Sequence, residues 1–149
     1  MILLAHMLFG AAIGHIVKSM PMAIILAFSS HYFLDLFPHV EYNIENIQKK
    51  QWKRAFPQFL AVLLDFLTGI LLISLLSDNR AIIYICAFLA VAPDGFSFLE
   101  SIIKTGLLKR HNQFHKDKIH FLKNKKISNF WRITSQVLAV IISVIILKS

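Results

Sequence analysis

The chain has few of the residues on which soluble domains depend. Only 16% of its 149 residues are charged and 56% are hydrophobic, against about 25% and about 45–50% in an average soluble domain. It has one cysteine, Cys86, which excludes an internal disulfide and a metal site built from several thiolates. Acidic residues are scarce, with 8 Asp and Glu beside 16 Lys and Arg. These shortages exclude an ordinary soluble domain and favour a membrane protein.

The hydrophobic residues are gathered into five long runs. Each run is close to the ~17–25 residues that a helix needs to cross a bilayer. We therefore predict an all-α fold, a bundle of five transmembrane helices that forms a single integral membrane domain over residues 1–149. The predicted spans are residues 1–17, 21–37, 56–76, 81–103 and 130–147.

The basic residues are concentrated on one side of this predicted bundle. Thirteen of the 16 Lys and Arg residues lie in the 38–55 loop, in the 104–129 segment or just inside the last span. The positive-inside rule then predicts a cytoplasmic (inner) membrane protein with its N-terminus in the cytoplasm and its C-terminus outside. Such lysines also contact anionic lipid headgroups, and the sequence has no nucleic-acid-binding motif. We expect membrane lipids as partners, and no nucleic acid.

Two histidines and a carboxylate interrupt the second hydrophobic run. His31 and Asp35 are four residues apart, so on a helix they lie on one face, one turn apart. Pro38 ends the helix, which leaves His39 able to fold back toward the pair. Imidazole and carboxylate at this spacing suit a zinc-class ion. A hydrogen-bonded pair that only holds helices together is the simpler alternative.

Other ionisable residues fall at a similar depth on the same side. At ~1.5 Å per residue, His6, Asp65 and Asp94 lie roughly 8, 14 and 15 Å from the cytoplasmic ends of their own spans. Each aspartate within a span costs about 2.5–3.5 kcal/mol on insertion scales, which a bound cation would offset. Asp65 and Asp94 are also candidate general bases, because burial raises the pKa of a carboxyl group. Asp94 follows Pro93, which should break or kink its helix.

The basic segment 104–129 is predicted to contain an amphipathic helix at the membrane interface. On a helical wheel its apolar and histidine residues fall within about an 80° arc, and most of its lysines lie outside that arc. The arc should face the bundle and bring His111 and His115 to the site, whereas His120 joins them only if the segment bends near Asp117. The residues of the arc are Leu108, His111, His115, Ile119 and Leu122.

The order of these motifs resembles that of small membrane-bound, metal-dependent hydrolase-like proteins of bacteria. The residues that carry the resemblance are His6, Gly10, Ser30-His31-x-x-x-Asp35, Pro38-His39, Pro93-Asp94, His111, His115 and His120. The His-x-x-x-Asp pair is also similar to that of zinc-dependent phospholipase C. Better-known members carry Pro-Asp-x-Asp-His where this chain has Pro93-Asp94-Gly95-Phe96-Ser97. The missing acid and histidine argue against a complete two-metal site.

We therefore expect a membrane-embedded, metal-dependent hydrolase that acts on a lipid phosphoester at the cytoplasmic face. Zn²⁺ suits the ligands best, with Mn²⁺ or Fe²⁺ next, and an open coordination position would lower the pKa of a bound water toward ~7. The alternatives are a proton- or metal-coupled transporter component and a non-catalytic membrane scaffold. The predicted metal ligands are His6, His31, Asp35, His39, Asp94, His111, His115 and His120, and the predicted phosphate-binding residues are Lys49, Lys50, Arg110 and Lys116.

Overall fold

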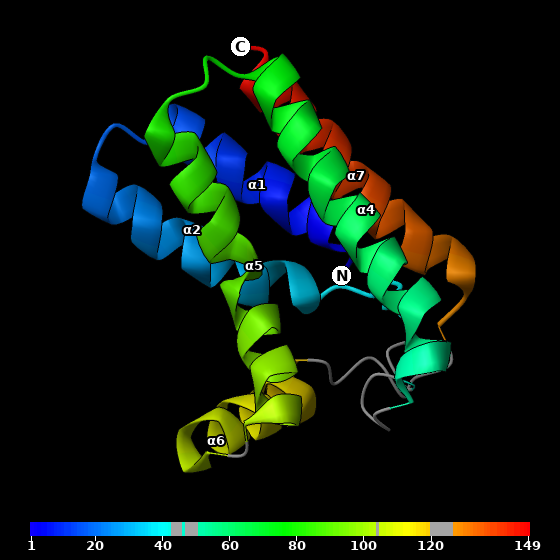
Figure 1. Ribbon diagram of the computed structural model, residues 1–149. Coiled ribbons are helices and arrows are strands. Elements are labelled where there is room, and N and C mark those ends of the chain that lie inside the picture. The colour runs from blue at the N-terminus through cyan, green and yellow to red at the C-terminus, as the bar shows by residue number, and fades with distance from the viewer. Residues whose placement is uncertain (43–45, 47–50, 104, 120–126) are drawn as a thin grey trace.

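All regular secondary structure in the described part of the chain is helical. The computed structural model describes residues 1–42, 46, 51–103, 105–119 and 127–149. A helix has formed in each of the five hydrophobic runs, and a further short helix has formed in the basic segment (Figure 1). In chain order the elements are α1 (Leu3–Ile16), α2 (Met20–Asp35), α4 (Trp52–Leu76), α5 (Ala81–Ile102), α6 (Gly106–Phe114), the π-helical turn η1 (His115–Ile119) and α7 (Asn129–Leu147).

The prediction of five membrane spans is wrong in number. Among the described residues, three helices are long and apolar enough to cross a membrane, and these suggest a membrane protein. The 14 residues of α1 and the 16 of α2 extend only roughly 21 and 24 Å, short of the ~30 Å hydrocarbon core. α2 is also interrupted by polar side chains and ends at Asp35, three residues before Pro38. The three long segments are Trp52–Leu76, Ala81–Glu100 and Asn129–Leu147.

α1 is the central helix of the bundle. It packs against α2, α4, α5 and α7, and glycine allows α5 to approach it closely. A methyl group added at Gly10 would lie 2.5 Å from the Cys86 carbonyl oxygen, and one added at Gly14 would lie 2.9 Å from the Ile82 carbonyl oxygen. Small residues at a helix interface are typical of packing between membrane helices, where backbone proximity supplies the van der Waals contact.

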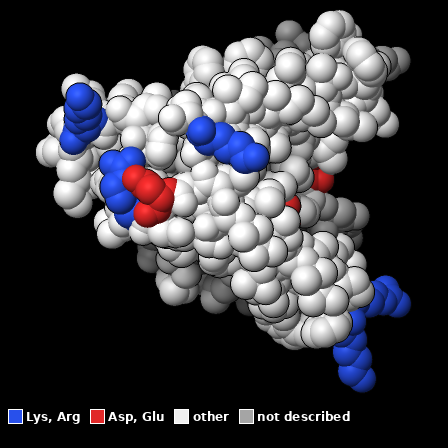
Figure 2. All heavy atoms as spheres, turned by 90° about the horizontal axis from the view of Figure 1, so that it is seen from above, with Lys and Arg blue, Asp and Glu red and all other residues white. Residues whose placement is uncertain are grey.

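The long helices expose apolar side chains on their outer faces. Leu75 on α4 is 70% exposed and Ile145 on α7 is 63% exposed. Seen from above, most of the surface carries neither acidic nor basic side chains, and the charged ones stand in isolated groups (Figure 2). A surface of this kind suits contact with lipid chains.

Hydrogen bonds fix which connections share an end of the bundle. At one end, Arg80 Nη2 donates to the carbonyl oxygen of His15 at 2.9 Å, so the α1–α2 turn lies beside the α4–α5 turn. Toward the other end, Ser135 Oγ donates to the carbonyl oxygen of Pro38, so the segment after α2 lies beside the first turns of α7. The ionisable residues of α2 therefore lie away from the two short turns.

Pro93 does not break α5. The helix continues from Ala81 to Ile102 with Pro93 inside it, so of the two predicted effects, a break or a kink, the break is wrong. Proline removes the N–H that would bond to the carbonyl of Leu89. The next carbonyl, that of Ala90, accepts a hydrogen bond from His31 at 2.8 Å. Contacts with α2 therefore support the turn that Pro93 weakens.

Candidate metal centre

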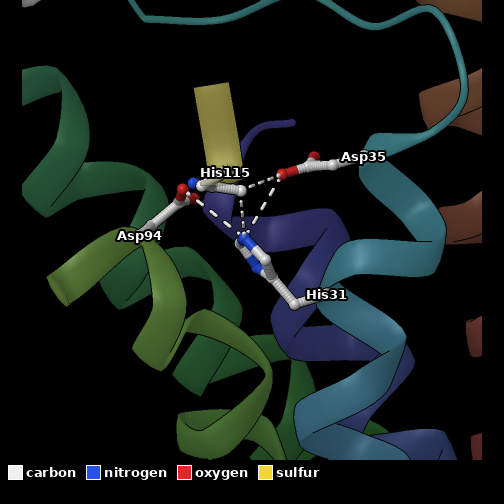
Figure 3. Close-up of side chains that lie close together, drawn as sticks. All are labelled: His31, Asp35, Asp94 and His115. Carbon is white, nitrogen blue, oxygen red and sulfur yellow. Dashed lines mark hydrogen bonds and ion pairs between the residues drawn. The ribbon is translucent and has the colours of Figure 1, made fainter. Parts of the chain in front are cut away.

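Four side chains from three separate elements meet beside the start of α1. His31 and Asp35 come from α2, Asp94 comes from α5 and His115 begins η1. One ligand atom from each residue lies within 4.8 Å of the others, so this group could hold a metal ion. Figure 3 shows the four side chains pointing toward one another. We call them the four-residue centre.

His31 Nε2 lies at the middle of this centre. It is 3.1 Å from His115 Nε2, 3.2 Å from Asp35 Oδ2 and 3.6 Å from Asp94 Oδ1. His115 Nε2 is in turn 3.2 Å from Asp35 Oδ2. Two imidazole nitrogens and two carboxylate oxygens form the mixed ligand set that zinc, manganese and iron accept.

The orientation of His31 is fixed by a hydrogen bond from the ring nitrogen that faces away from the centre. Its Nδ1 lies 2.8 Å from the Ala90 carbonyl oxygen, and a carbonyl can only accept, so Nδ1 carries the hydrogen. In a neutral imidazole Nε2 then presents its lone pair to the centre. His115 is held in a similar way, with Nδ1 3.3 Å from Ser97 Oγ. Partners of this kind orient the histidine ligands of metal sites.

The second oxygen of Asp35 faces three further groups. Oδ1 lies 2.8 Å from the amino nitrogen of Met1, 3.2 Å from His6 Nε2 and 3.6 Å from His39 Nε2. His39 folds back after Pro38, and its Nδ1 donates to the Phe37 carbonyl oxygen at 2.7 Å. The structure thus brings His6 and His39 to Asp35 but not into the four-residue centre.

Three of the four side chains of the centre are buried, and the fourth, Asp94, gives the centre an open side. The side chains of His31 and Asp35 are 0% exposed and that of His115 is 4% exposed, whereas the side chain of Asp94 is 31% exposed. A carboxylate as deeply buried as Asp35 requires close partners, because removing its charge from water is costly. Asp94 marks the side from which a further group could approach.

His111 lies next to the four-residue centre but outside it. Its Nε2 is 3.0 Å from the hydroxyl of Tyr32, and its ring lies 5.7 Å from that of His115. Burial, and next the neighbouring His115 and His31, lower the pKa of His111, with Asp94 acting in the opposite direction. Tyr32 was not among the predicted site residues, although it directly follows His31.

Asp65 is placed at the start of α1. Its Oδ2 accepts a hydrogen bond from the backbone N–H of Leu4 at 2.8 Å and another from the hydroxyl of Tyr42. Burial, and then the bond to Asp65, raise the pKa of Tyr42. A carboxylate in this position satisfies an N–H group that the first turn of a helix leaves free and interacts favourably with the helix dipole. Asp65 is not part of the four-residue centre.

The other predicted site residues are not among the four residues of the centre. Arg110 is exposed on α6, one residue from His111. α6 turns its buried Asn112 toward the bundle, and His115 follows on the same side, while Leu107 and Phe114 are exposed. Three predicted residues, His120, Lys49 and Lys50, lie outside the described residues, as does the side chain of Lys116.

Comparison of the chain with protein-family models, with curated proteins and with solved structures finds no match.

Proposed function

We propose that this protein is a membrane-embedded, metal-dependent hydrolase whose ion is bound by the four-residue centre. The observation that carries the proposal is the orientation of His31. Because Nδ1 donates to Ala90, the Nε2 lone pair faces two carboxylate oxygens, those of Asp35 and Asp94, at 3.2 and 3.6 Å. Hydrogen-bond acceptors that face one another in a buried site need a positive centre between them.

A divalent cation meets this need better than a single proton does. A hydrogen on His115 Nε2 can be donated to His31 Nε2 or to Asp35 Oδ2, and in either case the contact between His31 and Asp94 has no hydrogen of its own. An ion held by both imidazoles and Asp35 can also attract the carboxylate of Asp94, directly or through a bound water. We propose zinc as the first candidate, with manganese or iron next, because the ligands are mixed nitrogen and oxygen.

The partial exposure of Asp94 supports a catalytic role over a purely structural one. Structural zinc sites have four protein ligands, whereas catalytic sites have three and keep the fourth position for water. In the proposed catalytic centre His31, Asp35 and His115 would be the ligands, and Asp94 would lie beside the open position. When bound, the ion would supply Lewis acidity and a water of lowered pKa. In the proposed hydrolysis, the water oxygen bonds to phosphorus while the bond from phosphorus to the leaving alcohol breaks. One water proton passes to the carboxylate of Asp94 and then to the leaving oxygen.

The orientation in the cytoplasmic membrane is also a proposal. α4 and α7 would run outward and α5 inward, so that the basic connections face the cytoplasm and Lys148 faces outside. A reporter active only outside the cytoplasm should work when fused after Ser149 and fail when fused after Lys126. The reverse pattern would place the centre on the outer side.

The hydrolase proposal is tested on protein purified in detergent. We expect about one zinc, manganese or iron per chain, and release of phosphate or alcohol from a panel of phosphoesters. A chelator should abolish turnover, and addition of the lost metal should restore it. Stoichiometric metal without turnover of any phosphoester, together with metal uptake into proteoliposomes, would replace the hydrolase by the transporter alternative.

A further inference from the structure

The open side of the four-residue centre has a polar pair beside it. The Tyr32 hydroxyl and His111 Nε2 are 3.0 Å apart, and the Tyr32 ring stands edge-on to both ligand imidazoles, 5.5 Å from that of His31 and 5.8 Å from that of His115. His111 Nδ1 is enclosed and has no hydrogen-bond partner among the described residues. When His111 Nε2 donates to the Tyr32 hydroxyl oxygen, the hydroxyl hydrogen is left to donate to an oxygen of a phosphate group.

Two exposed phenylalanines flank this polar pair. The ring of Phe96 on α5 lies edge-on to His111 at 5.6 Å, and that of Phe114 on α6 lies edge-on to Tyr32 at 6.4 Å. Phe96 is 40% exposed and Phe114 is 53% exposed. The approach to the centre is therefore polar at its middle and apolar at its edges.

The centre also lies within the length of the long helices, not at their ends. The first turn of α1 bonds to Asp65, which is near the middle of α4. His31 bonds to Ala90, which is near the middle of α5. If these helices cross the bilayer, the centre lies below the membrane surface, where an amphiphile has access and a small charged solute does not.

We propose that the open side binds a lipid phosphoester from the bilayer. Tyr32 donates to one of its phosphate oxygens, His111 holds the Tyr32 hydroxyl in place, and the lipid chains lie against Phe96 and Phe114. This inference rests on the proposed metal-dependent hydrolase and specifies the class of its substrate. The polar pair recognises the phosphate, and the two rings discriminate against phosphoesters that have no apolar chain.

Binding of two non-hydrolysable phosphonates tests the inference separately from turnover. Metal-loaded protein in nonionic detergent is titrated by calorimetry with dodecylphosphonate and with methylphosphonate, and the Asp35→Asn protein serves as the blank for micelle partition. We expect dodecylphosphonate to bind at least about 10-fold more tightly, because its chain removes apolar surface from water. Equal affinity for the two compounds would overturn the inference.

Substitutions then locate the binding surface. Phe96→Ser and Phe114→Ser should each weaken dodecylphosphonate binding about 3–10-fold and leave methylphosphonate binding unchanged, because each removes part of the apolar contact. Phe130→Ser is the matched control, since Phe130 is 68% exposed at the start of α7. Tyr32→Phe should weaken both compounds about 5-fold through loss of one hydrogen bond. An equal effect of Phe130→Ser would overturn the placement.

Failure of this inference and failure of the proposed function give different results. If dodecylphosphonate binds as expected but no phosphoester is turned over, the lipid site stands and the hydrolase proposal fails. If soluble phosphoesters are hydrolysed as fast as lipids and both phosphonates bind equally, the hydrolase stands and the lipid site fails. Metal content is measured for every variant, and an unchanged value shows that the fold around the centre is intact.

Discussion

Two of the histidine–aspartate pairs among the described residues have very different surroundings. His31 and Asp35 are 3.2 Å apart with both side chains 0% exposed. His15 and Asp78 are 3.8 Å apart, with side chains 19% and 49% exposed. The buried pair adjoins groups from α1, α5 and η1, whereas the exposed pair adds Arg80, whose Nε lies 2.5 Å from Asp78.

This contrast shows that residue types alone do not make a metal centre. The exposed pair is already neutralised by a guanidinium group, and water can solvate what remains. In the buried pair Oδ1 of Asp35 faces the Met1 amino group, but Oδ2 of Asp35, His31 and Asp94 converge on a second point in a region that excludes water, so that a cation there has much more to contribute. Convergence and burial distinguish the two pairs, although both contain the same two side chains.

The largest expected effect is the loss of bound metal when the buried pair is substituted, and no loss when the exposed pair is substituted. Asp35→Asn keeps the volume of the side chain and removes its charge, so metal affinity should fall by at least about 10–100-fold. Asp78→Asn is the matched substitution and should leave the metal content unchanged. Both proteins should still insert in the membrane. Elemental analysis of the purified proteins gives the result.

Two outcomes would contradict this prediction. Equal metal loss in both variants would mean that the binding is not confined to the four-residue centre. A wild-type protein without metal under several purification conditions would remove the ligand interpretation altogether. His31→Ala combined with Asp35→Asn should be no worse than either single change, because one site can be lost only once.

The next largest effect concerns the packing that brings α1 to α5. Gly10→Ala places a methyl group 2.5 Å from the Cys86 carbonyl oxygen, so it should lower the free energy of unfolding by about 1–3 kcal/mol. Gly95→Ala is the control, because a methyl group there meets nothing within 4 Å. It should be neutral, or stabilising by up to about 1 kcal/mol, since alanine favours a helix. Unfolding in detergent by heat compares the two, and equal stabilities would contradict the close contact of α1 with α5.

A smaller effect tests how α6 faces the bundle. Asn112 is 8% exposed and donates to Glu100 Oε2 at 2.9 Å, whereas the adjacent Gln113 is exposed. In a Cys86→Ala background, Gln113→Cys should react with a membrane-impermeant maleimide at least about 5-fold faster than Asn112→Cys in opened membranes, because reaction requires an accessible thiolate. Equal rates would mean that α6 does not pack against α5.

Local patterns in the sequence predicted the helices and the first half of the centre. The hydrophobic runs place all five helices, because apolar composition is a local property. The spacing of His31 and Asp35 predicts their common face, because an α-helix repeats every 3.6 residues. His111 of α6 and His115 of η1 are also four residues apart, and His115 reaches the centre although it lies 80 residues from Asp35 in the chain.

Three features of the structure could not be predicted from these local patterns. The number of spans was overestimated because apolar runs do not show where a helix ends. Counting residues from helix ends gave the depth of Asp65 but not its partner, because Asp65 bonds to the first turn of α1 and is not part of the four-residue centre. The partner that orients His31 is a backbone carbonyl, that of Ala90, and every residue has one, so it leaves no signal in the sequence.

The smallest expected effect is on the stability of the exposed pair. Asp78→Asn removes the charge that faces Arg80 and His15, at distances of 2.5 and 3.8 Å. Surface ion pairs contribute only about 0–1 kcal/mol, so the unfolding temperature should fall by no more than about 2–4 °C. At 1 M salt the Debye length is about 3 Å, so the difference in unfolding temperature from wild type should become smaller still. Thermal unfolding at low and high salt gives the comparison. A large loss that salt does not reduce would mean that this pair, like His31 and Asp35, is shielded from water, and the contrast between the two pairs would no longer hold.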